Sequence, residues 1–319
     1  GASLRGPAKQ SGDRYHPVWG NALELTQGHA TDDEIRFKGA TGGILTGLAN
    51  FLIASGKVVF VLHVEPSDAE PMRNNPRISR SREDLIKGTA SRYGPVAPLA
   101  DISEILDLGQ KFAVVAKPCD IGALRNLAKT DPRVDRLIPY MLTMICEGVP
   151  HYVSTVEIVE RRGIKEQEVT KLRYRGHGWP GLTHIETMDG RVMDLSYTDT
   201  WRTDMPYELQ FRCKICPDAI GQVADIAVSD SWLNGGPAVE DEPLNGIIVR
   251  TKRGRELFDA AVKAGALEIK RDSGIAEISE LQSHQVRKRR AVWARLTGIA
   301  IAGKPVPFVT DLALRDCAS

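Results

Sequence analysis

The sequence has almost no net charge. Its 42 Lys and Arg residues are offset by 41 Asp and Glu residues, which leaves a formal net charge of +1. A chain without a global positive field lacks the attraction that nucleic-acid binding usually needs. The apolar runs are also short, well below the roughly 20 residues of a membrane-spanning helix. We therefore expect neither nucleic acid nor a membrane among the partners of this protein.

Cysteine is scarce, with five residues in a chain of 319. So few cysteines in a long chain argue against a disulfide scaffold of the kind that small secreted proteins use. The chain also opens without a positively charged, apolar leader that ends in a cleavage site. We expect a cytoplasmic, reducing location, in which the thiols stay available as ligands.

The length allows one large or two moderate domains, and 42% hydrophobic with 26% charged residues is an ordinary enzyme composition. Strand and helix patterns alternate from about residue 36, which predicts an α/β fold with a mostly parallel sheet in the N-terminal half. The second half adds α+β elements, with an inserted antiparallel section and a cysteine-bearing loop. We expect an extended lead-in over residues 1–35, two halves over 36–150 and 151–275, and a helix and tail over 276–319.

Apolar periodicity predicts the individual elements. Helices are expected over residues 44–55, from Ser81, and over 101–108, 121–129, 254–264 and 282–296. Strands are expected over residues 57–64, in the runs that end at Cys119 and Cys146, and over 222–228 and 246–250. Antiparallel strands are expected over residues 152–159, 168–174 and 183–189.

Four of the five cysteines have the spacing of a thiolate site. Cys119 and Cys146 each close an apolar, strand-like run, and Cys213 and Cys216 form a C-x-x-C pair. Ligands gather beyond the carboxyl ends of strands in open parallel sheets, so the first two thiols are expected to converge and the pair to fold over them. Such a Cys₄ set suits an iron–sulfur cluster or zinc. Cys317, near the carboxyl end, is expected to be a bystander.

Other interpretations of these cysteines stay open. Cys119 and Cys146 are also explained as small buried hydrophobic residues, and the C-x-x-C pair as a thioredoxin-like or zinc motif. Zinc sites usually show two close pairs, whereas ligands scattered over nearly a hundred residues favour a cluster at a domain seam. Asp120 is expected to cap a helix that starts at Ile121, which would place Cys119 near a helix N-terminus and lower the pKa of its thiol.

The turn Thr41-Gly42-Gly43 opens a predicted helix. Free backbone N–H groups and the helix dipole attract an anion at such a place, typically a phosphate. The turn lacks the G-x-G-x-x-G pattern of dinucleotide-binding folds, and many similar turns only cap a helix.

A second loop, Ser91-Arg92-Tyr93, combines a hydroxyl, a cation and an aromatic ring. These groups suit the phosphate or the ring of a flavin, and a plain polar connection explains them equally well. Lys117, next to a bound flavin, would stabilise negative charge on the reduced ring. A solvated lysine is the alternative.

Trp179 lies in a loop of Gly, His, Trp and Pro that would cover a planar ligand by stacking. His177 in the same loop is a candidate proton donor near neutral pH, although a lone histidine is more often structural. The basic run 287–290, followed by Trp293, is typical of a nucleic-acid helix. Because the rest of the chain is neutral, a solvated helix face or a partner contact is the favoured interpretation.

Six motifs follow one another along the chain. They are Gly39-Ala-Thr-Gly-Gly43, Gly88-Thr-Ala-Ser-Arg-Tyr93, Lys117-Pro-Cys-Asp-Ile-Gly-Ala-Leu-Arg125, Arg175-Gly-His-Gly-Trp-Pro-Gly181, Arg212-Cys-Lys-Ile-Cys-Pro-Asp218 and Ala224-Asp-Ile-Ala-Val-Ser-Asp-Ser-Trp232. Together they resemble the coenzyme F420 hydrogenase/dehydrogenase beta-subunit family. That family includes F420-reducing hydrogenase and formate dehydrogenase beta subunits, and plant and bacterial reductases of chlorophyll intermediates. The resemblance runs from about residue 15 to residue 265.

The resemblance implies FAD and [4Fe–4S] clusters, with a flavin-binding first half and a second half that binds cluster and substrate. Carried over by motif, the cluster ligands would be Cys119, Cys146, Cys213 and Cys216. FAD would be held by the turn around Gly42/Gly43 and by Ser91-Arg92-Tyr93. Many members carry an N-terminal segment of closely spaced cysteines, which this sequence lacks, so one cluster is the expected maximum.

The chain departs from the family pattern near the expected active site. Ser229-Asp230 stands where members often have Gly-Asp, and Glu147 follows Cys146 where small residues are common. For this reason the family's substrate, F420 included, is not carried over to this chain.

Our hypothesis is an iron–sulfur flavoprotein reductase. Electrons would pass from an external donor, such as ferredoxin or a partner subunit, through the cluster to FAD and then as hydride to an unsaturated or aromatic small molecule. The candidate catalytic residues are His177, Lys117 and Asp230, with Tyr93 as a further proton donor.

Two alternatives remain. The first is a non-catalytic electron-transfer subunit that links a hydrogenase or dehydrogenase to a deazaflavin or nicotinamide cofactor. The second is a zinc-stabilised binding protein without redox chemistry. The sequence leaves the oligomeric state open, and homodimers or trimers are common among such enzymes.

Overall fold

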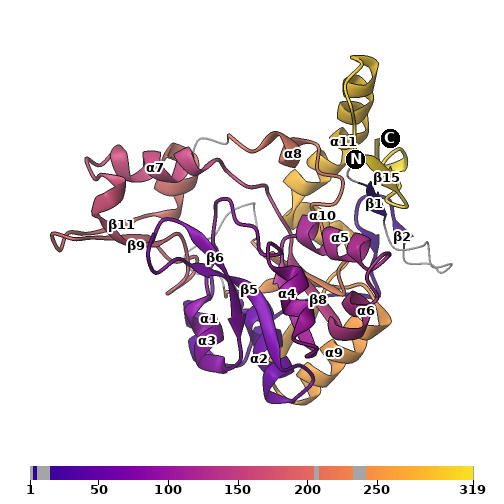
Figure 1. The fold of residues 1–319 in the computed structure, drawn as a ribbon, viewed down its shortest axis with the longest axis horizontal. Coiled ribbons are helices and arrows are strands. Elements are labelled where there is room, and N and C mark those ends of the chain that lie inside the picture. Colours follow the sequence, from indigo (N-terminus) through magenta and orange to yellow (C-terminus); the bar gives the residue numbers. More distant parts are fainter. Residues whose placement is uncertain (1–2, 6–14, 205–207, 233–241, 319) are drawn as a thin grey trace.

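The computed structural model describes residues 3–5, 15–204, 208–232 and 242–318, and it is built around an eight-stranded mixed sheet (Figure 1). The strand order is β14-β4-β13-β12-β8-β7-β5-β6. Its centre is parallel and consists of β12 (Ile226–Asp230), β8 (Tyr140–Met144), β7 (Phe112–Ala116) and β5 (Phe60–Pro66). The α/β fold class is confirmed, but the sheet as a whole is mixed, because three of its seven strand pairings are parallel and four are antiparallel.

Antiparallel strands complete the sheet on both sides. On one side, β13 (Asn245–Val249) pairs with β12, β4 (Glu24–Ala30) with β13, and β14 (Leu267–Asp272) with β4. On the other side, β6 (Asn74–Ser79) pairs with β5. The expected lead-in over residues 1–35 did not anticipate β4. Its run of Thr, Gln and His reads as polar, yet Gln27 is fully buried and donates to Glu277 at 2.7 Å.

Helices cover both faces of the sheet because alternate strand residues point to opposite sides. Val61 and Ala113 pack with Leu48 of α2 on one face. Phe60 and Phe112 pack with helices of the other face, and their rings stack at 4.8 Å. The first face carries α2 (Ile44–Ala54) and α9 (Lys252–Lys263). The second carries α4 (Ile102–Asp107), α5 (Pro118–Leu127) and α6 (Arg133–Leu137).

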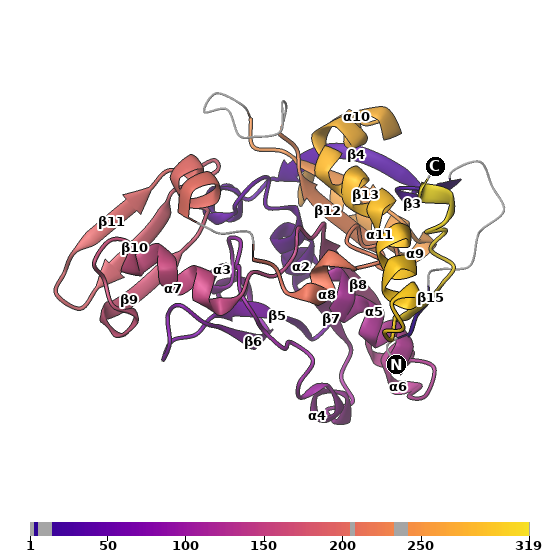
Figure 2. The ribbon, with the colours of Figure 1, turned by 90° about the horizontal axis from the view of Figure 1, so that it is seen from above.

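A smaller unit lies at one end of the molecule, away from α11 (Figure 2). Its antiparallel sheet consists of β9 (Val169–Arg173), β10 (Thr183–Thr187) and β11 (Val192–Leu195), which confirms the strands expected at 168–174 and 183–189. The strand expected at 152–159 is wrong, because these residues form α7 (Tyr152–Glu160). The segment is rich in β-branched residues, but Thr155, Ile158 and Val159 are buried at helical spacing.

The remaining elements are short or terminal. The expected C-terminal helix is confirmed as α11 (Ser283–Ile301), preceded by α10 (Ile275–Leu281). The others are β1 (Ser3–Arg5), β2 (Tyr15–His16), β3 (Gly20–Asn21), α1 (Asp33–Lys38), α3 (Arg82–Lys87), α8 (Phe211–Lys214) and β15 (Phe308–Thr310). In the part of the chain that is described, no helix has both the length and the apolar character to cross a membrane.

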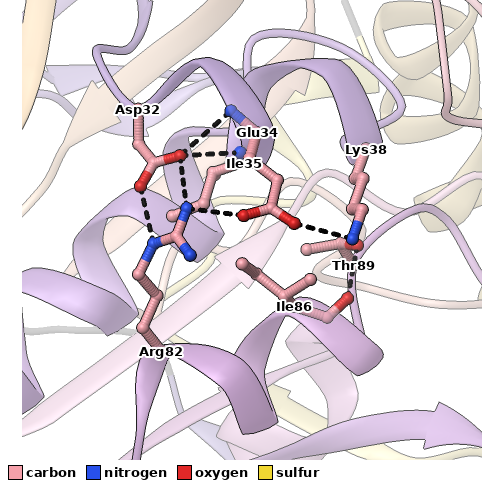
Figure 3. Close-up of polar contacts among 7 residues, drawn as sticks. All are labelled: Asp32, Glu34, Ile35, Lys38, Arg82, Ile86 and Thr89. Carbon is pink, nitrogen blue, oxygen red and sulfur yellow. Dashed lines mark hydrogen bonds and ion pairs between the residues drawn. The ribbon is translucent and has the colours of Figure 1, made fainter.

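Helices α1 and α3 are tied together by Arg82 (Figure 3). Asp32 caps α1 by accepting from the N–H groups of Glu34 and Ile35 at 3.0 Å. Arg82 of α3 donates to both carboxylate oxygens of Asp32, at 2.8 and 2.9 Å, and to Glu34 at 2.8 Å. The hydrogen bond from Arg82 is the main cause that holds the pKa of Asp32 below its ordinary value. Since α1 leads into the turn at 39–43 and α3 into the loop at 88–93, this contact positions both.

Replacing Arg82 by Met is expected to loosen these two loops. Hydrogen exchange at residues 39–43 and 88–93 should accelerate, while exchange in the central strands stays unchanged. The lowered pKa of Asp32 means that the tether stabilises the fold above the ordinary Asp pKa of about 3.9 and loses this effect as pH falls through the lower, folded-state value.

The difference between the Arg82→Met variant and the wild type should therefore shrink in acid. Arg80→Met is the control, because Arg80 bonds to Gln110 and not to α1. Equal loop exchange in both variants would contradict the assignment.

Candidate functional site

The parallel strands deliver three of the predicted site residues to one edge of the sheet. β7 and β8 are neighbours, with Ala116 opposite Thr143. Cys119 follows the end of β7 and Cys146 follows the end of β8. Asp230 is the last residue of β12, which pairs with β8 on its other side. The strand order thus brings these three positions to one edge of the sheet, as the carboxyl ends of neighbouring parallel strands must lie.

The C-x-x-C segment closes over this edge. Cys213 lies in α8, and its Sγ accepts from the backbone N–H of Val149 at 3.3 Å. The N–H of Cys146 donates to the carbonyl of Ala219 at 2.8 Å. Both contacts join the segment after β8 to the segment around the pair.

The four thiols lie close enough together to affect one another's ionisation. Cys119 and Cys213 each influence Cys146, and Cys119 influences Cys216. Cys317, as expected, lies apart: it is buried and donates to the carbonyl of Pro17.

Burial is the dominant influence on these thiols. It raises the pKa of Cys146 to about 11 and that of Cys216 to about 12. Lys288 of α11 acts against burial at both thiols. The lowered pKa predicted for Cys119 is wrong. Cys119 does lie in the first turn of α5, but burial of the thiol raises its pKa, with Asp120 as the second cause.

Arg175 connects the segments that surround the second part of the site. It is 3% exposed, and its guanidinium donates to Asp230 at 2.9 Å, to the Tyr93 hydroxyl at 3.3 Å and to the Ala40 carbonyl at 3.0 Å. Although burial disfavours its charge, Asp230 and Tyr93 outweigh this effect and raise the pKa of Arg175. One side chain thus joins the turn at 39–43, the loop at 88–93 and the end of β12.

Aromatic rings gather around this guanidinium. The guanidinium carbon of Arg175 lies 4.7 Å from the centre of the Trp232 ring. The ring centres of Trp232 and Trp179 are 5.7 Å apart. Tyr93 contacts Trp201 at 4.2 Å. The aromatic cluster consists of Tyr93, Tyr174, Trp179, Tyr197, Trp201 and Trp232.

Three indole N–H groups in the aromatic cluster are buried without a hydrogen-bond acceptor among the described residues, those of Trp179, Trp201 and Trp232. A buried indole N–H normally finds an acceptor. Three such donors together mark a place that suits a planar molecule carrying acceptor atoms.

The glycine turn is shaped by packing as much as by any ligand. Thr41 is buried and accepts from the Asn245 side chain, whose oxygen accepts from the N–H of Ile44 at 3.2 Å. A Cβ on Gly42 would stand 2.8 Å from the carbonyl oxygen of Gly28, and Gly43 has φ +74°. Asn245 therefore caps α2 from β13, a role that no sequence motif had indicated.

The other predicted residues differ in their surroundings. Ser91 is half-buried. Arg92 donates to the Asn74 side chain and to the Leu172 carbonyl, both at 2.7 Å, and so fixes the loop at 88–93 to these two segments. Lys117 pairs with Asp120 at 2.9 Å, beside Cys119.

His177 is exposed, and its ring contacts Phe37 at 5.7 Å. Burial, and then Arg173 and Lys38, lower its pKa. Among the described contacts, neither His177 nor Lys117 touches Asp230, whereas Tyr93 reaches Asp230 through Arg175.

Comparisons with known proteins identify relatives of this chain. Residues 25–103 match the family model described as coenzyme F420 hydrogenase/dehydrogenase, beta subunit N-term, and residues 109–273 match the model for the C terminus of the same subunit. The chain is 25% identical to the coenzyme F420 hydrogenase subunit beta of Methanococcus voltae, over 91% of this chain and 99% of that protein. It is 24% identical to the coenzyme F420-dependent sulfite reductase of Methanocaldococcus jannaschii, over 79% of this chain and only 38% of the reductase.

A solved structure shares the fold. One chain of the F420-reducing nickel–iron hydrogenase complex from Methanosarcina barkeri superimposes with a TM-score of 0.68 at 23% identity, covering 90% of this chain and 96% of that one. The named relatives are oxidoreductases or their subunits.

Removal of Arg175 should destabilise the fold strongly. Arg175→Met leaves Asp230 without its partner and is expected to cost about 3 kcal/mol in urea unfolding at pH 7, the size typical of breaking a buried ion pair. Replacing Asp230 by Asn in the same chain should recover part of this loss, which a double-mutant cycle measures. Arg173→Met, on the half-exposed neighbouring position, is the control. A cost for Arg175→Met no larger than the control would contradict its connecting role.

The half-buried thiols of Cys146 and Cys216 should react slowly when no metal is bound. With pKa values of about 11 and 12, Cys146 and Cys216 are protonated at neutral pH, and their alkylation by iodoacetamide should accelerate about tenfold per pH unit below those values. Lys288→Met should slow both reactions at a given pH, because the cation favours the thiolates. Peptide mass spectrometry reads each thiol separately. The exposed neighbour Arg287→Met is the control, and equal rates in the two variants would contradict the role of Lys288.

Proposed function

The chain belongs to the coenzyme F420 hydrogenase/dehydrogenase beta-subunit family, and from this premise we propose that it is an iron–sulfur flavoprotein oxidoreductase. It takes single electrons from an external protein donor and delivers hydride to an unsaturated or aromatic small molecule. A cluster at the thiols would supply one-electron transfer, and bound FAD would supply hydride, formed from two such electrons and one proton taken up from water.

The observation that carries the proposal is the adjacency of the thiols and the aromatic cluster. Cys146 and Asp230 follow neighbouring parallel strands. The start of α11 bonds to both places: Gln282 donates to the carbonyl of Asp230 at 2.8 Å, and Gln285 to the carbonyl of Cys146 at 3.1 Å. Two redox groups held at these places would be neighbours, as electron transfer between them requires.

The thiols suit a cluster better than a single ion. Within the described residues, no three His, Cys, Asp or Glu side chains converge tightly enough for one metal ion. A [4Fe–4S] cluster spreads its ligands more widely, because each thiolate binds a different iron. The raised pKa values of the half-buried Cys119, Cys146 and Cys216 also suit a group whose positive charge removes their protons. Cys119, Cys146, Cys213 and Cys216 would hold the cluster.

The aromatic cluster suits FAD. Three of its indole N–H groups lack an acceptor among the described residues and would offer donors to the acceptor atoms of a flavin ring, and its rings offer stacking surfaces. Trp179 and Tyr93 would contact the ring. The turn at Thr41-Gly42-Gly43 and the loop at Ser91-Arg92 would hold the rest of the cofactor, and the charge of Lys117 would act from the thiol side.

The proton donor follows from the same contacts. The oxygen of Tyr93 accepts from Arg175, which leaves the phenolic hydrogen to be donated to a substrate. Asp230 accepts from Arg175 and holds it in place. His177 lies at the surface and would act only on a substrate that reaches over Trp179. These contacts favour Tyr93 over His177, Lys117 and Asp230 as the donor.

A second candidate is an electron-transfer subunit of a larger enzyme. The relatives favour this candidate, because several of them are beta subunits. The match to one of these subunits spans 99% of that subunit's length. Copurification with a large catalytic subunit would support it, and substrate reduction by the isolated chain would count against it.

Anaerobic purification with assays of iron, sulfide and flavin tests the proposal. We expect about four irons and four sulfides per chain, and one FAD. Cys213→Ser should lose the iron and the cluster's part of the visible spectrum, while the flavin absorption remains. The matched control is Cys317→Ser, since Cys317 is also buried but lies away from the other thiols.

The possible failures are distinct. Full iron content in the Cys213→Ser variant would contradict the assignment of Cys213 as a cluster ligand. Stoichiometric zinc without flavin would contradict the redox function and indicate a structural metal. Flavin without iron would leave a simple flavoenzyme.

A further inference from the structure

A groove lies between the short helix α8 and the C-terminal half of α11. Figures 1 and 2 label both helices. Its volume is about 540 Å³. The groove is lined by Phe211, Lys214, Ile215, Ala294, Arg295, Gly298, Ile299, Ala302 and Lys304. None of its α11 residues falls within the ranges matched by the family models, which end at residue 273.

The walls of the groove are apolar and open to solvent. Phe211 of α8 lines the groove and is 65% exposed, and the half-buried Ile215 and Ile299 add apolar surface beside it. An exposed aromatic ring next to further apolar side chains in one groove marks an interaction site more often than a scattered apolar residue does.

The rim of the groove is positive. α11 contains Arg287, Lys288, Arg289, Arg290 and Arg295 and no carboxylate. Arg289 is buried and bonds to Gln222 and to backbone carbonyls, so it serves the fold. Within the described residues no ion pair holds Lys214, Arg295 or Lys304, and all three are exposed. In a chain of net charge +1, this local excess of cations calls for an acidic partner.

The groove also touches the thiol site. Lys214 and Ile215 are the two residues between Cys213 and Cys216, so one wall of the groove is the C-x-x-C segment itself. Arg295 fastens the two walls together by donating to the carbonyl of Lys214 at 2.6 Å. A molecule seated in the groove would lie against the two residues that separate Cys213 from Cys216, the pair that would hold the proposed cluster.

We propose that this groove is the docking site of an acidic one-electron carrier protein, with an apolar side chain of the carrier against Phe211 and its carboxylates facing Lys214, Arg295 and Lys304. This inference rests on the proposed function, because it needs a cluster at Cys213 and Cys216. One electron leaves the reduced metal centre of the carrier and enters the cluster, so the carrier is oxidised, the cluster is reduced, and no proton or bond is exchanged.

The test measures cluster reduction by a reduced acidic ferredoxin in stopped flow, under anaerobic conditions. Reduction of the wild type should slow as salt rises. The double variant Arg295→Glu/Lys304→Glu should be reduced about tenfold more slowly at low salt, as charge reversal lowers association rates. Phe211→Ala should slow reduction with little change in the salt dependence. The control is Lys57→Glu/Lys263→Glu, which reverses the same charge at exposed positions of other helix ends.

Dithionite separates the two proposals, because a small reductant needs no docking. Full iron content and normal reduction by dithionite in the groove variants, with slow reduction by ferredoxin, would support the docking site. Groove variants that ferredoxin reduces as fast as the control would overturn it and leave the proposed function intact. A wild type without a reducible cluster would overturn both. If the wild type and the control are dimers and the groove variants are monomers, a second copy of this chain occupies the groove instead, and the docking proposal is overturned.

Discussion

The buried guanidinium of Arg175 is the contact on which the arrangement of the site depends. It bonds to Ala40, Tyr93 and Asp230, which belong to three segments separated by many residues and by several elements of the sheet. A charge that is 3% exposed must keep these partners, because removing any of them leaves a charge or a polar group unpaired in the interior. The price of burial thus enforces one geometry. The next residue must be glycine for a steric reason. A Cβ on Gly176 would stand 2.4 Å from the carbonyl oxygen of Lys38.

The sheet order supplies the second constraint. β12, β8 and β7 are parallel neighbours, so whatever follows each of them lies along a single edge. Cys119, Cys146 and Asp230 occupy that edge, and the C-x-x-C segment and the start of α11 close over it. Thiols and aromatic rings therefore become neighbours through topology, without any closeness in sequence.

Helix α11 divides its work between its faces. Gln285, Lys288 and Arg289 point inward, where they bond to carbonyls of the thiol segments. Arg287, Arg290 and Arg295 lie on the exposed side. The basic run that resembles a nucleic-acid helix in sequence is thus partly a structural brace and partly an exposed positive face. The same stretch of cations stabilises a buried site and presents a charged surface, because a helix turns successive residues to different sides.

The sequence by itself determined the α/β class and most helices and strands, since these depend on local periodicity and on turn residues, and it singled out four cysteines as candidate ligands. It could not reveal β4, whose Gln27 and His29 are buried only because distant residues supply partners, nor α7, whose β-branched residues mimic a strand. It named the motif of Arg175 but not its role, and it missed Asn245, Trp201 and Lys288 as parts of the site. The pKa of Cys119 also depended on burial and not on its helix position. Only the tertiary structure decided these points, because burial and long-range hydrogen bonds are properties of the assembled chain and not of any window along it.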